Sequence, residues 1–132
     1  MNITIRTIPH AEQRYPTAGD WWFDDAGDLQ IRVSAMGNWR YETLVARHEL
    51  DEALLCKAHG IPQESVDAFD AGWAIAEWAL GEPNVDEPGL NPAAPYHVEH
   101  MTAYAAELAF MVNLGVAFNE YTEALARLFG ER

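Results

Sequence analysis

The longest helical pattern in the chain runs from Asn38 to Gly60, where apolar residues recur with the period of an α-helix. Asn38 suits the N-cap position, and Gly60 followed by Pro62 predicts the end of the helix. At about 100° per residue, one side of this helix collects four apolar residues, a histidine and a glutamate. These are Leu44, Val45, His48, Glu52, Leu55 and Cys56. The pattern therefore predicts two ionisable side chains inside a stripe that faces the core.

Shorter segments in which apolar and polar residues alternate precede this helix and predict three strands. They cover Asn2–Ile8, Gly19–Asp24 and Leu29–Ser34. The turn Asp25–Asp28 contains a glycine and joins the last two strands into a hairpin. We therefore expect a small three-stranded antiparallel sheet ahead of the helix.

The rest of the chain predicts three further helices, which begin at Pro62, at Tyr96 and at an N-cap residue, Asn119. The segment Gly81–Pro95 contains four prolines and two glycines, which predicts a long loop. This loop is interpreted either as a cover for a substrate site or as a surface crossing without function. The expected fold is α+β, a three-stranded antiparallel sheet followed by about four helices, in one domain over residues 1–132.

The histidine and the glutamate in the apolar stripe need a partner, because a buried, unpaired carboxylate is costly. A metal ion, a buried cation or a shared proton can remove that cost. His48 and Glu52 are four residues apart, so their side chains point the same way and can share one metal ion. A second interpretation stays open, in which they hydrogen-bond each other or pair with Arg40 or Arg47.

Glu49 follows His48 directly and lies about 100° further round the helix. The general base has this position in the His-Glu-x-x-His helix of metalloproteases. The segment here reads His48-Glu49-Leu50-Asp51-Glu52, so a glutamate stands at the last position of that motif.

A zinc site that is open to substrate takes three protein ligands and a water, so a third ligand has to come from elsewhere in the chain. The segment His97–His100 holds two histidines and is the richest source. We predict His100 as the third ligand, which completes a set of two histidines and one carboxylate around zinc. His97 and Asp70 stay open as alternatives for this position.

Composition and charge narrow the choice of partners. The 132 residues include 21 acidic and 8 basic side chains, a net charge of −13, which argues against binding to a nucleic-acid backbone. This charge permits attraction of metal cations or basic partners.

Cys56 is the only cysteine, which excludes a disulfide within the chain. No segment has the apolar core of a signal peptide or the length of a membrane span, so we expect a cytoplasmic protein without a membrane partner.

Four segments of the chain resemble a family of small phage and prophage proteins of unknown function. They are GDWWFD, LQIRVS, WRYETLVARHELDEALLC and PYHVEH. The order of a three-stranded sheet and a helix carrying His48-Glu49 also resembles a minimal zincin-type metallopeptidase domain, over roughly Leu29 to His100. The zincin resemblance implies that His48 is a zinc ligand, that Glu49 is the general base and that Glu52 replaces the second histidine. The phage resemblance implies the host-cell cytoplasm.

These observations support two functional hypotheses. The first is a metal-dependent hydrolase of minimal zincin type, with Glu49 as general base for a zinc-activated water and a peptide as one candidate substrate. The second is a phage accessory or acidic interaction protein without catalysis, with a structural role or as a nucleic-acid mimic. A mimic needs its acids on one exposed face, whereas here they are spread through turns and helix starts. The sequence does not indicate the oligomeric state.

Overall fold

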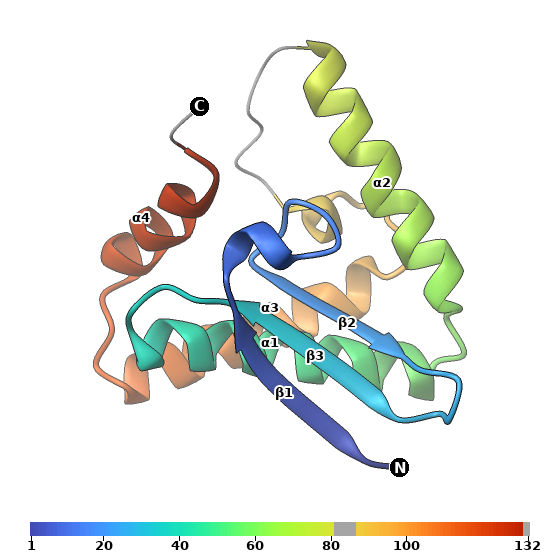
Figure 1. Ribbon diagram of the computed structural model, residues 1–132, viewed down its shortest axis with the longest axis horizontal. Helices are drawn as coiled ribbons and strands as arrows, with labels where there is room; N and C mark the ends of the chain where they lie inside the picture. The colour runs from blue at the N-terminus through green and yellow to red at the C-terminus, as the bar shows by residue number, and fades with distance from the viewer. Residues whose placement is uncertain (81–86, 131–132) are drawn as a thin grey trace.

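The computed structural model of the protein describes residues 1–80 and 87–130. Within them the chain forms three strands and then four α-helices, with two short 3-10 helices between (Figure 1). The elements are β1 (Ile3–Ile8), η1 (His10–Glu12), β2 (Gly19–Phe23), β3 (Leu29–Ser34), α1 (Trp39–Ala58), α2 (Gln63–Leu80), η2 (Pro88–Leu90), α3 (His97–Asn113) and α4 (Phe118–Phe129). The α+β class is therefore as predicted.

The sheet is mixed, so the expectation of a fully antiparallel sheet is wrong. Strand β3 lies in the centre, with β2 antiparallel on one side and β1 parallel on the other. The connection from β1 to β2 crosses the end of β3, where the Ser34 hydroxyl lies 2.8 Å from His10 Nδ1 and 3.1 Å from Gln13 Nε2. Alternation in β1 predicts which residues share a face, but it carries no information on the direction of the neighbouring strand.

Helix α1 lies between the sheet and α3 (Figure 1). The β3 side chains that point toward α1 are at most 1% exposed and pack against Leu44 and Val45 of the helix; they are Leu29, Ile31 and Val33. Because α1 has neighbours on both sides, a residue that faces α3 is buried as deeply as one that faces the sheet. This arrangement takes His48 and Glu52 into the interior.

The ends and the exposed side of α1 agree with the sequence pattern. Asn38 Oδ1 accepts a hydrogen bond of 3.0 Å from the Arg40 backbone N–H, and the helix stops before Gly60, which has φ +68°. On the exposed side, Arg47 pairs with Asp51 at 2.9 Å. Because Arg47 forms this ion pair with Asp51, the structure does not support the alternative in which Arg47 pairs with His48 or Glu52.

The remaining helices are close to the expected ranges, with one difference at the start of α4. The N-cap of α4 is Ala117, whose extended backbone leads directly into the helix at Phe118. Asn119 therefore lies in the first turn, and the expectation that it caps the helix is wrong. Within the predicted loop Gly81–Pro95, residues 81–86 lie outside the described residues, and the part from Glu87 onward contains η2.

A length and composition test for membrane spans gives no single candidate helix in the described part of the chain. Helices α3 and α4 meet the test only when they are taken together across their 119° bend.

Candidate metal centre

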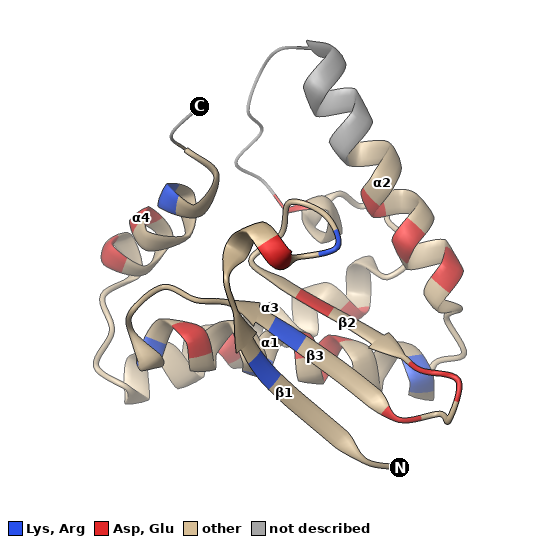
Figure 2. Ribbon diagram, in the orientation of Figure 1, with Lys and Arg blue, Asp and Glu red and all other residues tan. Residues whose placement is uncertain are grey.

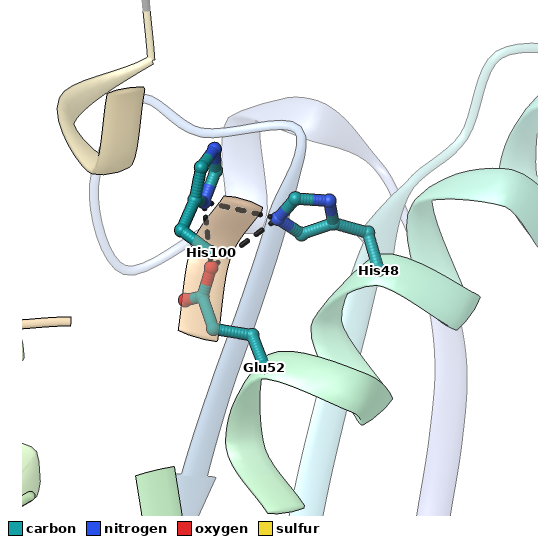
Figure 3. Close-up of side chains that lie close together, drawn as sticks. All are labelled: His48, Glu52 and His100. Atoms are coloured by element: carbon teal, nitrogen blue, oxygen red, sulfur yellow. Dashed lines mark hydrogen bonds and ion pairs between the residues drawn. The ribbon is translucent and has the colours of Figure 1, made fainter. Parts of the chain in front are cut away.

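The three predicted ligands meet between α1 and α3 (Figure 3). His48 and Glu52 come from neighbouring turns of α1, and His100 comes from the first turn of α3. Their exposed fractions are 5%, 6% and 4%. His48 Nε2 lies 3.2 Å from Glu52 Oε2 and 3.1 Å from His100 Nδ1, and His100 Nδ1 lies 2.7 Å from the same Glu52 oxygen. Three potential ligand atoms thus converge on one point.

The separations are close to those of a zinc site. Four ligands at about 2.0–2.1 Å from a tetrahedral zinc ion lie about 3.3–3.4 Å from one another. The distances from His48 to the other two ligand atoms, 3.1 and 3.2 Å, are within a few tenths of an ångström of that value. The 2.7 Å contact between His100 and Glu52 has the length of a hydrogen bond, so these residues also form ion pairs with each other.

Each of the three residues is held by a second group on the side away from this point. His48 Nδ1 lies 2.7 Å from Glu107 Oε1, and the Trp21 indole N–H donates to Glu52 Oε1 at 3.0 Å. His100 Nε2 lies 2.9 Å from Glu87 Oε2. That contact has the distance of an ion pair but lacks hydrogen-bond geometry, so we treat Glu87 as a charge partner. Such supporting partners orient the ligands of metal sites.

The hydrogen bond to Glu107 determines which atom of His48 can bind a metal. A carboxylate only accepts hydrogen bonds, so Nδ1 of His48 carries the proton that is donated to Glu107. In the neutral imidazole, Nε2 is then an acceptor with a free lone pair. It faces a carboxylate oxygen and a second imidazole nitrogen, and such a group of acceptors needs either an added proton or a cation between them. The donor set therefore fits a divalent metal ion.

The pKa values show the charge that this environment favours. Burial opposes a charge on His48, but its hydrogen bonds to Glu107 and Glu52 outweigh burial and raise the pKa well above the usual value. Burial likewise opposes a charge on His100, yet Glu52 and Glu87 raise its pKa to about 9. Burial alone would raise the pKa of Glu52, and the two histidines instead lower it to about 2. The environment therefore favours a positive charge at the two imidazoles, which either a proton or a metal ion can supply.

Glu49 lies on the flank of α1 that faces β2, apart from the convergent atoms. A Cβ atom added at Gly19 would lie 2.6 Å from Glu49 Cγ and 2.7 Å from Glu49 Oε1, so the glycine gives this side chain its space. Burial and then the Glu52 carboxylate raise the pKa of Glu49 well above its usual range. The Glu49 carboxyl is not one of the convergent groups.

The alternative ligands lie elsewhere. His97 Nδ1 is bound to the backbone carbonyl of Gly89 at 2.9 Å. Asp70 accepts a hydrogen bond from the Tyr96 hydroxyl, and burial raises the pKa of Asp70 to about 7. The structure therefore brings His100 to His48 and Glu52, and it places neither His97 nor Asp70 among them.

Four supporting residues were not predicted: Trp21, Glu87, Glu107 and Tyr121. The Tyr121 hydroxyl of α4 donates to Glu107 Oε2 at 2.6 Å, so Glu107 links α4 to His48. The sequence offers a signal only for Glu107, which lies two helical turns after His100 and hence on the same side of α3. Trp21 and Tyr121 read as ordinary core residues, because their partners lie far away in the chain.

We expect Glu107→Gln to weaken zinc binding by about 10- to 100-fold, the usual cost of changing a group that supports a ligand. The amide removes the negative charge beside His48 and sets an N–H₂ group against either His48 or Tyr121. Competition with a chromophoric chelator measures the affinity. Tyr121→Phe removes only the hydroxyl and should have a smaller effect. Equal affinity of Glu107→Gln and the parent protein would contradict this role.

Comparisons with models of protein families, with curated proteins and with solved structures find no match to this chain.

Proposed function

We propose that this protein is a zinc-dependent hydrolase of minimal zincin type, with His48, Glu52 and His100 as zinc ligands and Glu49 as general base. One observation carries the proposal. Three buried atoms able to bind a metal lie within 3.2 Å of one another, while the far side of each residue has its own partner. A chance ion pair does not require that every member be oriented from outside.

The ligand set supports hydrolysis in particular. Two histidines and one carboxylate recur in hydrolytic zinc sites, with a fourth position left for water or substrate. When bound, zinc polarises a carbonyl group and lowers the pKa of a water molecule. Here the carboxylate ligand comes from the same helix as the first histidine, and the second histidine comes from α3. The segment His-Glu-x-x-Glu thus replaces His-Glu-x-x-His without changing the kinds of ligand.

Glu49 is assigned the general-base role because of its position. It follows His48 in α1, as the general base does in the His-Glu-x-x-His helix, and lies on the flank of the helix that faces β2. In this role Glu49 takes a proton from the attacking water molecule and passes it to the leaving group.

A cavity of about 260 Å³ lies between the β1–β2 connection and α2. Arg14, Tyr15, Asp67, Asp70 and Ala71 line it. Asp70 contacts the Tyr96 hydroxyl, and the Tyr96 ring lies 6.2 Å from the His100 ring, centroid to centroid. Tyr96 thus lies between the cavity and His100, and none of the three proposed ligands lines the cavity. The charged and phenolic lining suits the polar backbone of a peptide.

The alternative of an acidic interaction protein has less support. Glu52, Glu99 and Glu107 are at most 6% exposed, so they cannot belong to an exposed acidic array. Figure 2 shows acidic residues on β2, α1, α2 and α4 and in the β2–β3 turn rather than on one element.

Protein purified without chelators or a nickel column is expected to contain about one equivalent of zinc by elemental analysis. Adding zinc to chelator-treated protein at 100 times Kd should stabilise it by roughly 2.7 kcal/mol, which a thermal unfolding experiment detects. Magnesium serves as a control, because it prefers oxygen ligands in an octahedral arrangement. Absence of zinc, together with an unchanged unfolding temperature after zinc is added, would refute the metal centre.

A further inference from the structure

The apolar face of the sheet continues past the helix that covers it. Ile3 and Ile5 of β1 lie in register with Leu29 and Ile31 of β3 and so share their face. The β3 residues are 0% and 1% exposed, whereas Ile3 and Ile5 are 45% and 49% exposed. Helix α1 packs on β2 and β3. An apolar strip along β1 therefore remains in contact with solvent.

The outer edge of β1 also offers backbone groups for pairing. The carbonyl groups of Asn2 and Ile8 accept hydrogen bonds from Leu29 N–H and Ala35 N–H, on the β3 side. Because successive residues of a strand point their backbone groups to opposite sides, Ile3, Ile5 and Thr7 direct theirs away from β3. In Figure 1, β1 forms the edge of the sheet. Long, exposed apolar edges are sites of strand pairing, and proteins usually cover or blunt them.

We propose that a second copy of this chain covers this edge, with the two β1 strands antiparallel about a two-fold axis at Thr4. Ile3 then lies opposite the partner's Ile5, and the reverse contact forms across the axis. Both residues direct backbone groups to the outer edge, so each such pair forms two hydrogen bonds. A two-fold interface repeats every contact, so each favourable pair in β1 counts twice.

The charges of β1 favour this register. Arg6 lies in register with Arg32 of β3, and no carboxylate among the described residues lies within ion-pair distance of Arg6. Like charges directly opposite each other in a sheet are destabilising. In the paired strands, Arg6 lies opposite the partner's Asn2.

The acidic side of this contact comes from the turn between β2 and β3. The backbone N–H of Asn2 donates to Asp28 Oδ1 at 2.8 Å, so Asp28 lies directly beside the strand end that receives the arginine. Figure 2 shows basic segments side by side on β1 and β3 and acidic segments in the β2–β3 turn. Each copy thus sets its unpaired arginine against the acidic turn of the other.

The oligomeric state in solution tests the proposal. Sedimentation equilibrium on protein without an N-terminal tag, which would extend β1, should give twice the monomer mass at high concentration. Ile5→Lys should raise the dimer dissociation constant by at least about tenfold, since the substitution occurs twice in the interface. Val98→Lys is the matched control, because Val98 on α3 is 66% exposed and lies outside the strand. Its dissociation constant should be unchanged.

Exchanging the charges of Arg6 and Asp28 distinguishes an effect on dimerisation from an effect on folding. Arg6→Glu removes the like charge in register with Arg32 within the monomer. It should nevertheless weaken the dimer, as should Asp28→Arg. The double variant Arg6→Glu/Asp28→Arg should recover dimerisation relative to either single variant. A protein that stays monomeric at every concentration, or a dimer that none of the β1 substitutions affects, overturns the proposal. Capture of an unrelated strand by monomeric protein would also count against it.

Discussion

Replacing His100 with alanine is expected to weaken zinc binding by more than about 100-fold, since changes to supporting residues alone cost about 10- to 100-fold. The substitution removes one of the three proposed ligands, and it leaves Glu52 Oε2 with His48 as its remaining imidazole partner in the centre. His97→Ala is the matched control, because His97 lies in the same turn of α3 but is bound to the backbone of η2. Its zinc affinity should stay within about tenfold of the parent value, below the usual cost for a supporting residue.

The affinities are measured by competition with a chelator, after circular dichroism has shown that both variants are folded. A loss of tenfold or less in His100→Ala would remove His100 from the ligand set. A loss in His97→Ala as large as that in His100→Ala would mean that the start of α3, rather than one imidazole, determines binding. The comparison therefore distinguishes a ligand from a structural neighbour.

Glu49→Gln is expected to abolish most of the hydrolytic activity while the zinc content stays at about one equivalent. General-base catalysis contributes roughly 10²- to 10⁴-fold, and an amide cannot accept the proton that a carboxylate accepts. The substitution keeps the shape of the side chain, which matters because Gly19 lies close against it. A panel of fluorogenic peptides provides the activity assay, and elemental analysis provides the zinc content.

Two outcomes would change this assignment. Loss of zinc in Glu49→Gln as complete as in His100→Ala would make Glu49 a ligand. Hydrolysis at the parent rate would assign the proton transfer to another group. A parent protein that holds zinc but hydrolyses no peptide of the panel would refute peptide hydrolysis and leave the metal centre standing.

The local part of the structure could be predicted because it depends on neighbours in the sequence. The extent of α1 follows from Asn38, Gly60 and the helical period, and the same period places His48 and Glu52 on one side. The sequence also predicts His100 as the third residue of the group, and the structure brings His100 to the other two residues.

The parts that could not be predicted depend on long-range pairing. The direction of β1 relative to β3 depends on how the chain crosses between β1 and β2, about which alternation within β1 says nothing. The contact from Trp21 to Glu52 and the contact from Tyr121 to Glu107 each join different elements. In the sequence, a tryptophan or tyrosine within an apolar pattern looks like any other core residue. Its polar role becomes visible only when the structure shows the carboxylate to which it donates.

The two glycines that adjoin the centre have a consequence for how distant relatives of this chain can be recognised. A Cβ atom at Gly89 would overlap the His100 ring, and one at Gly19 would press on the Glu49 side chain. A relative that keeps the proposed centre is expected to keep glycine at both positions, whereas the apolar core can exchange one hydrophobic residue for another. Gly19 and Gly89 should therefore identify a distant relative as reliably as the three proposed ligands do.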